Sequence, residues 1–201
     1  MKKVVWIASL ALALTGAVQA AGDVQAGKAK SAVCAACHGA DGNGSSANPL
    51  FPKLAGQHPK YIVKQLRDFK AGARKNQTMA PMAAPLSDQD MENLAAYFSS
   101  QQHSVGAAAA DKVAQGEQIY RAGLAKGVPP CSGCHGPAGA GNAAAGFPSI
   151  GGQNAAYVAK QLKDFRDGAR SNDPNSMMRG VVALMNDRDI EAVAQYVQGL
   201  H

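Results

Sequence analysis

The segment Cys34-Ala-Ala-Cys37-His38 returns later in the chain as Cys131-Ser-Gly-Cys134-His135, and the two copies contain all four cysteines. Two cysteines separated by two residues and followed at once by histidine are typical of c-type haem attachment. The thiols form thioether links to one porphyrin, and the adjacent histidine gives a nitrogen to its iron. The pattern therefore predicts two haem c groups, held covalently by Cys34, Cys37, Cys131 and Cys134, with His38 and His135 as proximal iron ligands.

Other uses of the cysteine pairs fit the sequence less well. An exported protein could join them as disulfides, because disulfides persist in oxidising compartments. A thioredoxin-like redox pair would require a strand–helix–strand context, and none is visible. A zinc site would need ligand pairs that lie 97 residues apart, with each histidine directly beside its cysteine, which is a poor geometry for one small ion. Haem attachment is the interpretation that accounts for both copies.

The N-terminus has the three parts of a secretory signal peptide. A positive start, Met1-Lys2-Lys3, precedes an apolar run from Val4 to Thr15 and a small-residue end at Val18-Gln19-Ala20. We expect residues 1–20 to be removed by cleavage after Ala20. The apolar run is too short to span a membrane comfortably. Loss of the two lysines lowers the formal charge from +6 to +4, which excludes the strongly basic surface of a dedicated nucleic-acid-binding protein.

The remainder of the chain is a tandem repeat. Three segments recur at an offset of 96 to 99 residues: 51–57 matches 147–153, 61–74 matches 157–170, and 88–97 matches 187–196. In the second of these pairs, nine of fourteen positions are identical. The repeat predicts two domains, residues 21–104 and 105–201. Each copy is small for a stable core, and a covalently held apolar porphyrin would supply the missing interior.

The apolar residues of each copy follow a helical period, so the predicted fold class is all-α. Ile62, Leu66 and Phe69 fall on one helix face, and the second copy repeats the stripe with Val158, Leu162 and Phe165. Further helices are expected from about Ala26 to Cys34 and from Lys112 to about Leu124. Two more are expected to begin at Ser87 and Asn186, because each precedes an aspartate by three residues.

A haem iron with one histidine ligand still needs a ligand on its other side, and the repeat selects a candidate. Of the methionines that follow the signal peptide, Met79 and Met178 alone coincide in the two copies, each eight residues before a predicted helix start. They are the predicted distal ligands. Met82 and Met177 are rivals, because a slip of one turn in an irregular loop could substitute them. The remaining histidines, His58, His103 and His201, are expected at the surface.

Two further residue pairs recur in register. Gln57 and Tyr61 match Gln153 and Tyr157, and could either reach a haem edge or serve helix capping and packing. Lys60, Lys64 and Lys70 could steer an acidic redox partner. Asp68 lies among these lysines, and this favours an ordinary solvated helix face instead.

With two Cys-x-x-Cys-His motifs, a repeated Phe-Pro-x-x-x-Gly-Gln, a repeated Lys-Gln-Leu-x-Asp-Phe and paired downstream methionines, the chain resembles the dihaem cytochrome c4 family. The resemblance covers residues 21 to 201. It implies two class I cytochrome c domains, each wrapped around one haem, in a periplasmic electron carrier that is loosely associated with the membrane. It also implies redox protein partners: a donor such as a quinol-oxidising complex and an acceptor such as a terminal cytochrome oxidase.

We expect an electron carrier that is not an enzyme, because two irons with ligands on both sides leave no open position for a substrate. One alternative is a dihaem redox enzyme, either a peroxidase or a sulfur-compound dehydrogenase, which would need an iron able to lose its distal ligand. Another is a haem subunit of a larger complex.

Overall fold

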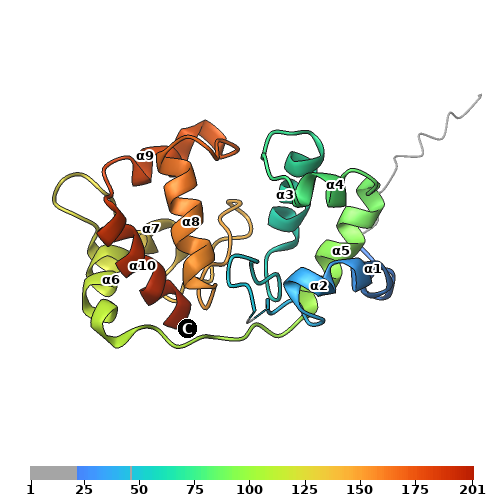
Figure 1. Cartoon of the computed structure of the whole chain (residues 1–201), viewed down its shortest axis with the longest axis horizontal. Coiled ribbons are helices and arrows are strands. Elements are labelled where there is room, and N and C mark those ends of the chain that lie inside the picture. The colour runs from blue at the N-terminus through green and yellow to red at the C-terminus, as the bar shows by residue number, and fades with distance from the viewer. Residues whose placement is uncertain (1–21, 46) are drawn as a thin grey trace, which may run out of the picture.

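The computed structural model describes residues 22–45 and 47–201, and throughout these it is helical, with two isolated β-bridges and no strand. The predicted signal peptide and its cleavage site lie outside the described residues. Figure 1 shows two helical domains side by side. The first contains α1 (Val24–Lys30), η1 (Ser31–Val33), α2 (Ala35–His38), α3 (Pro59–Lys70), α4 (Met79–Ala83) and α5 (Asp88–Ser100). The second contains α6 (Ala110–Ala122), α7 (Ser132–His135), α8 (Ala155–Arg166), η2 (Pro174–Ser176), α9 (Met177–Val182) and α10 (Asp187–Gly199).

The two predicted helix starts are confirmed, and each is a complete capping box. The Ser87 hydroxyl accepts from the Asp90 N–H, and the Asp90 carboxylate accepts from the Ser87 N–H. Asn186 and Asp189 make the same pair of bonds at the start of α10. These bonds satisfy backbone donors that the first turn of a helix cannot pair. The expected first helix of each copy begins two residues earlier than predicted.

Each domain crosses its first helix over its last at a glycine. A Cβ atom added to Gly27 of α1 would lie 2.0 Å from the carbonyl oxygen of Asn93 in α5. A Cβ atom on Gly116 of α6 would lie 2.3 Å from the carbonyl oxygen of Ala192 in α10. Backbones that approach this closely leave room only for glycine. Neither glycine stands out in the sequence repeat, although both copies use one in the same way.

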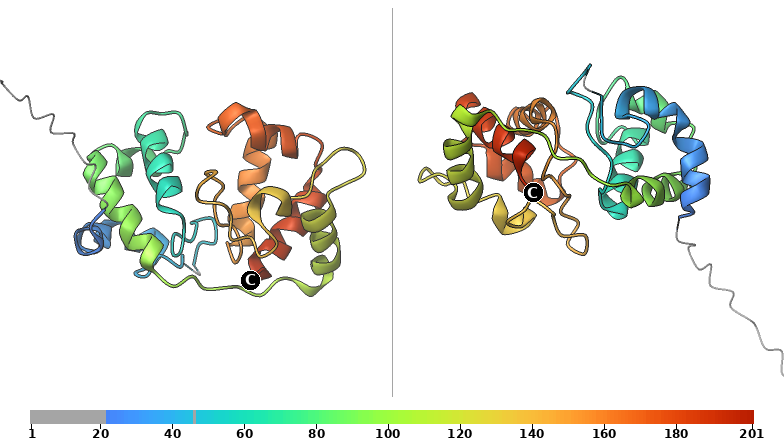
Figure 2. Two further views of the ribbon diagram at one scale, coloured as in Figure 1. Left: turned by 180° about the vertical axis from the view of Figure 1, so that it is seen from behind. Right: turned by 90° about the horizontal axis from the view of Figure 1, so that it is seen from below.

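An extended linker between α5 and α6 joins the domains and runs along one edge of the molecule (Figures 1 and 2). Helices α3 and α8 face one another across the boundary, and the loops that follow α2 and α7 meet beside them. In the part of the chain that the structure describes, no helix has the length and apolar character needed to cross a membrane.

Candidate haem sites and the domain interface

The two Cys-x-x-Cys-His segments adopt the same local structure. In each copy the first cysteine immediately precedes a single helical turn, α2 or α7, and the histidine is the last residue of that turn. Residues three apart on one turn lie on the same face, so both thiols of a copy can reach one planar group. None of the four cysteines is paired in a disulfide, so all four are available for attachment. In the polypeptide before attachment, burial raises the pKa of the Cys34 thiol and raises that of Cys131 to about 11.

Both motif histidines are buried and oriented by a proline carbonyl. His38 Nδ1 donates to the Pro52 carbonyl at 2.9 Å, and His135 Nδ1 donates to the Pro148 carbonyl at 3.0 Å. A carbonyl only accepts, so the proton lies on Nδ1 and the lone pair of Nε2 is left for a metal. Burial also lowers the pKa of both imidazoles, which favours the neutral form that binds iron. The donor set therefore fits a covalently attached haem in each domain.

The candidate methionines fall into three groups. Met91 and Met185 are buried in the two hydrophobic cores. Met82 and Met177 are exposed, at 38% and 41% of their surface. Met79, the first residue of α4, and Met178, the second residue of α9, are partly buried. The two methionines that the repeat selects therefore share an intermediate degree of burial, which distinguishes them from the buried and the exposed methionines.

The segments that lead to Met79 and Met178 differ in length and structure. Four residues, 75–78, separate Arg74 from Met79, whereas seven residues, 171–177, separate Arg170 from Met178. In the short segment, the Asn76 side-chain oxygen accepts from the backbone N–H groups of Thr78 and Met79, at 3.0 and 2.8 Å.

The longer segment contains two non-glycine residues in the left-handed region, Asn175 and Ser176, with φ of 53° and 57°. Asp173 lies at its centre, with a side chain only 2% exposed. The Asp173 carboxylate accepts from the backbone N–H and the Nε–H of Arg179, at 3.0 and 2.8 Å. Burial alone would raise the pKa of Asp173, but these hydrogen bonds hold it below its ordinary value, so the carboxylate is charged.

The recurring glutamines hold the domains together. Gln57 donates to the Ser149 carbonyl at 2.7 Å and accepts from the Ser149 N–H at 3.0 Å. Gln153 makes the mirrored pair with Lys53, at 2.9 and 2.8 Å. Each side chain thus pairs with the backbone of the other domain much as a neighbouring strand would. The structure shows that both glutamines pack between the domains.

Beside the glutamines, Arg74 and Arg170 form a reciprocal cluster in which each guanidinium crosses to the other domain. Arg74 donates to Tyr157 at 3.0 Å and to Gln161 at 2.7 Å, and Arg170 donates to Tyr61 and Gln65, both at 3.1 Å. The two arginines are only 8% and 7% exposed. Each also lies over a phenylalanine ring of its own domain, Phe69 or Phe165, at 4.6 and 4.4 Å from the ring centroid.

The acceptors of both guanidinium groups are amides and hydroxyls, so this part of the interface carries net positive charge. This charge acts on Tyr61. Burial alone would raise the pKa of this phenol, but the charges of Arg170, Arg74 and Lys64, together with the hydrogen bond from Arg170, lower it. In the sequence, the only sign of the cluster is that Gln65 and Arg74 recur in register as Gln161 and Arg170.

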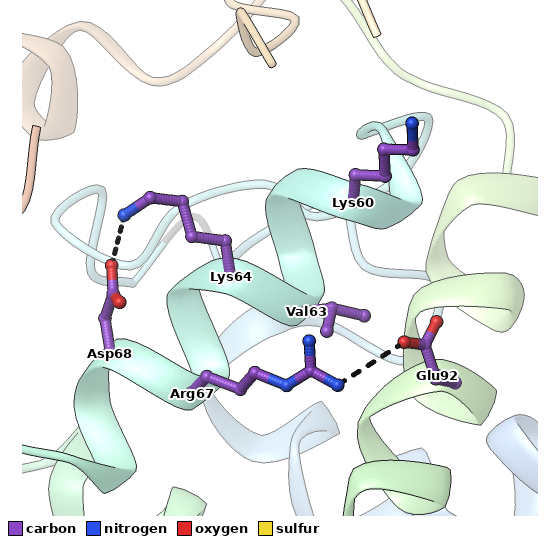
Figure 3. Close-up of a pocket in the computed structure, with 6 residues that line it drawn as sticks. All are labelled: Lys60, Val63, Lys64, Arg67, Asp68 and Glu92. Atoms are coloured by element: carbon purple, nitrogen blue, oxygen red, sulfur yellow. Dashed lines mark hydrogen bonds and ion pairs between the residues drawn. The ribbon is translucent and has the colours of Figure 1, made fainter. Parts of the chain in front are cut away.

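The lysines considered for partner docking are largely engaged within the chain. Lys64 pairs with Asp68, and Lys70 donates to the Leu86 carbonyl at 2.6 Å. Figure 3 shows the groove of about 290 Å³ between α3 and α5 in which Lys60, Lys64 and Arg67 alternate with acidic residues. Arg67 reaches the Glu92 carboxylate there, at 3.7 Å. This balance of charge is typical of an ordinary solvated helix face, which the position of Asp68 among the lysines favoured.

Two of the three remaining histidines are not simple surface residues, contrary to expectation. His58 Nε2 bonds to the Ala140 carbonyl of the second domain at 2.9 Å. His103, in the linker, lies against the two turns that precede the interface glutamines, and its Nε2 is buried without a hydrogen-bond partner. His201 is exposed, as expected. The expectation was wrong for the first two because their neighbours come from distant parts of the chain.

Comparison with known proteins agrees with this architecture. The cytochrome c family model matches the chain twice, at residues 24–102 and 113–201. Cytochrome c4 of Stutzerimonas stutzeri is 54% identical, and the alignment covers all of both chains. The crystal structure of reduced recombinant cytochrome c4 from Pseudomonas stutzeri superimposes with a TM-score of 0.87 at 54% identity, over 90% of this chain and 100% of that one.

A more distant relative, the thiosulfate dehydrogenase electron acceptor of Stutzerimonas stutzeri strain A1501, is 41% identical over 81% of this chain and 76% of its own length. The full-length matches, the repeated cytochrome c domain and the paired attachment motifs support one conclusion. The chain belongs to the dihaem cytochrome c4 family of electron carriers and holds two covalently bound haem c groups.

Proposed function

We propose that this protein is a periplasmic carrier that passes single electrons from a quinol-oxidising complex towards a terminal cytochrome oxidase, and that it is not itself an enzyme. In this proposal the signal peptide directs export, and the chain divides into domains at residues 21–104 and 105–201. Cys34 and Cys37 hold the first haem, and Cys131 and Cys134 hold the second. His38 with Met79, and His135 with Met178, are the axial ligand pairs.

The chain's own residues have defined tasks in this proposal. When bound, each haem supplies an iron that accepts and releases one electron. The Pro52 and Pro148 carbonyls keep each histidine in the tautomer that presents Nε2. A methionine on the opposite side raises the reduction potential relative to a second histidine. Burial of both histidines limits the access of water and so limits reorganisation around each iron.

The observation that carries the proposal is that both copies place an oriented histidine and a partly buried methionine in matching positions. An enzyme of the peroxidase or dehydrogenase type would need one site to differ by lacking a strong distal ligand. The interface supports a carrier with two linked centres, because it pairs the domains through reciprocal bonds of Gln57 and Gln153 and does not leave them independent. Association with the membrane surface would be peripheral.

One relative suggests a second electron donor, because it is named as the electron acceptor of thiosulfate dehydrogenase. By this similarity, the present chain could receive electrons from a sulfur-compound dehydrogenase while remaining a carrier.

The test is a spectroscopic redox titration of the purified, correctly matured protein, followed by mixing with candidate partners. We expect two one-electron transitions and a far-red sulfur-to-iron band in the oxidised form. We also expect rapid oxidation by a terminal oxidase, and no turnover of peroxide or thiosulfate by the protein alone. Peroxide or thiosulfate turnover without a partner would contradict the carrier proposal.

A further inference from the structure

The segment that leads to Met178 is bonded directly to the first domain. The Asn172 side-chain amide donates to Gln65 at 3.0 Å and to Asp68 at 2.5 Å, both on α3. Lys64, also on α3, donates to the Asn172 carbonyl at 2.8 Å. One residue of the second domain is thus held by three side chains of the first.

Asp173, the residue after Asn172, fixes the local structure of the segment that leads to Met178. Asp173 accepts two hydrogen bonds from Arg179, the residue that follows Met178. Ser176 occupies the N-cap position of α9 in a left-handed conformation, and its side chain makes no capping hydrogen bond. Asp173 caps the helix instead, by accepting from the Arg179 N–H. The segment between Asp173 and Met178 is therefore closed into a loop whose base is the Asp173–Arg179 pair.

The first copy lacks this arrangement for a reason visible in the sequence. Asn76 and Asn172 occupy equivalent positions after Arg74 and Arg170. Asn76 caps the helix that begins at Met79, and among the described residues no hydrogen bond joins 75–79 to the second domain. Three additional residues in the second copy move Asn172 away from its helix. Its amide then reaches α3, and Asp173 becomes the cap.

We propose that Asn172 and Asp173 form a strut between α3 and the Met178 loop, through which the first domain controls how firmly the distal ligand of the second haem is held. This rests on the proposed function, which assigns Met178 as that ligand. The first copy has no matching strut, because Asn76 bonds within its own domain and the nearest interdomain bond before Met79 is that of Arg74. A partner that displaces α3 would therefore alter the second site through Asn172.

The experiment measures the rate at which imidazole displaces the methionine sulfur in the full-length oxidised dihaem protein, followed at the far-red band. Met79→His and Met178→His assign the two kinetic phases to the two domains. In Asn172→Ala and Asp68→Ala we expect the second-site phase to accelerate at least about three- to ten-fold, because both variants lose the hydrogen bond between Asn172 and Asp68. The first-site phase should stay unchanged.

Four further variants complete the design. Asp164→Ala alters the counterpart of Asp68 on α8, whose side chain bonds only within its own helix, and it should change neither phase. Asn76→Ala should accelerate the first-site phase alone. Asp173→Asn removes the charge but keeps an acceptor, and should accelerate the second-site phase less than Asp173→Ala. Far-UV circular dichroism checks that each variant is folded.

The outcomes separate the strut from the ligand assignment. If Met178→His leaves the far-red band intact, the proposed ligand is wrong. If that variant removes about half of the band but Asn172→Ala and Asp68→Ala leave the second-site rate unchanged, the strut is wrong and the carrier proposal stands. Equal acceleration of both phases would show general loosening of the protein and would also overturn the strut.

Discussion

The two domains share a motif, a helix order and a pair of capping boxes, but they differ in how each supports its proposed methionine ligand. The first domain caps Met79 directly with Asn76. The second uses a longer loop, a buried Asp173–Arg179 pair and a link to the other domain through Asn172. The two segments differ by three residues in length, and the two proposed methionine ligands receive different support.

The domains also differ in the size of their cores. Among the residues that the structure describes, twelve buried residues form the hydrophobic cluster of the second domain and eight form that of the first. Cys34 packs against the smaller cluster and Cys131 against the larger one. The first domain therefore depends more on its haem for a packed interior. At the interface, by contrast, the two domains contribute nearly equivalent hydrogen bonds.

The largest effect should come from removing one attachment site. Cys34→Ala combined with Cys37→Ala should lower the haem content from two per chain to one, and the small first core should then lose helical structure. Cys131→Ala with Cys134→Ala should remove the other haem while leaving more of its domain folded. Haem absorbance per protein and far-UV circular dichroism measure both. Equal loss of helix in the two double variants would show that core size does not distinguish the domains.

Exchange of the distal ligands should have the next largest effect. Met79→His and Met178→His should each remove about half of the far-red band and lower one of the two midpoint potentials, because a second histidine replaces sulfur at the iron. Met82→Leu and Met177→Leu serve as controls and should leave the band intact. Loss of the band in either control would transfer the assignment to the rival methionine.

The reciprocal arginines offer a test of symmetry. Arg74→Met leaves the Tyr157 hydroxyl without this donor and removes one of the two arginine donors to Gln161. We expect a loss of about 2 kcal/mol in the free energy of unfolding. Arg170→Met should cause a similar loss, and the double variant should lose less than the sum, because the two side chains share one network. Chemical denaturation measures each value, with exposed Arg188→Met as control. A clear inequality between the two single variants would contradict the reciprocity.

The smallest effect should be a dependence on pH that comes from His103. Burial and the nearby charge of Lys53 lower the pKa of His103. Between the lowered pKa and its ordinary value near 6.5, the unfolded chain binds a proton that the folded protein does not. Stability should therefore fall as the pH drops below about 6.5, and less so in His103→Asn. Identical pH profiles for the two proteins would show that His103 does not cause the dependence.

Much of each domain could be predicted from local patterns. The attachment motif, the helical stripes and the cap residues each follow rules that act over a few residues, so they can be predicted from the sequence alone. The helix crossings at Gly27 and Gly116 could not be predicted, because a glycine indicates a close approach only when the backbone that it approaches is known. The surface expectation for His103 failed for the same reason, since the turns that cover it lie far away in the chain.

By itself, the sequence determined that the chain is duplicated, helical and built to hold two haems, because these properties reside in short motifs and their repetition. Only the tertiary structure decided what Arg74, Gln57 and Asn172 do. Their partners belong to the other domain, and no local spacing records which surfaces meet. Asn76 and Asn172 show this most directly. Equivalent positions of the repeat serve a helix cap in one domain and an interdomain bond in the other, because the segments differ by three residues and each amide therefore reaches different partners.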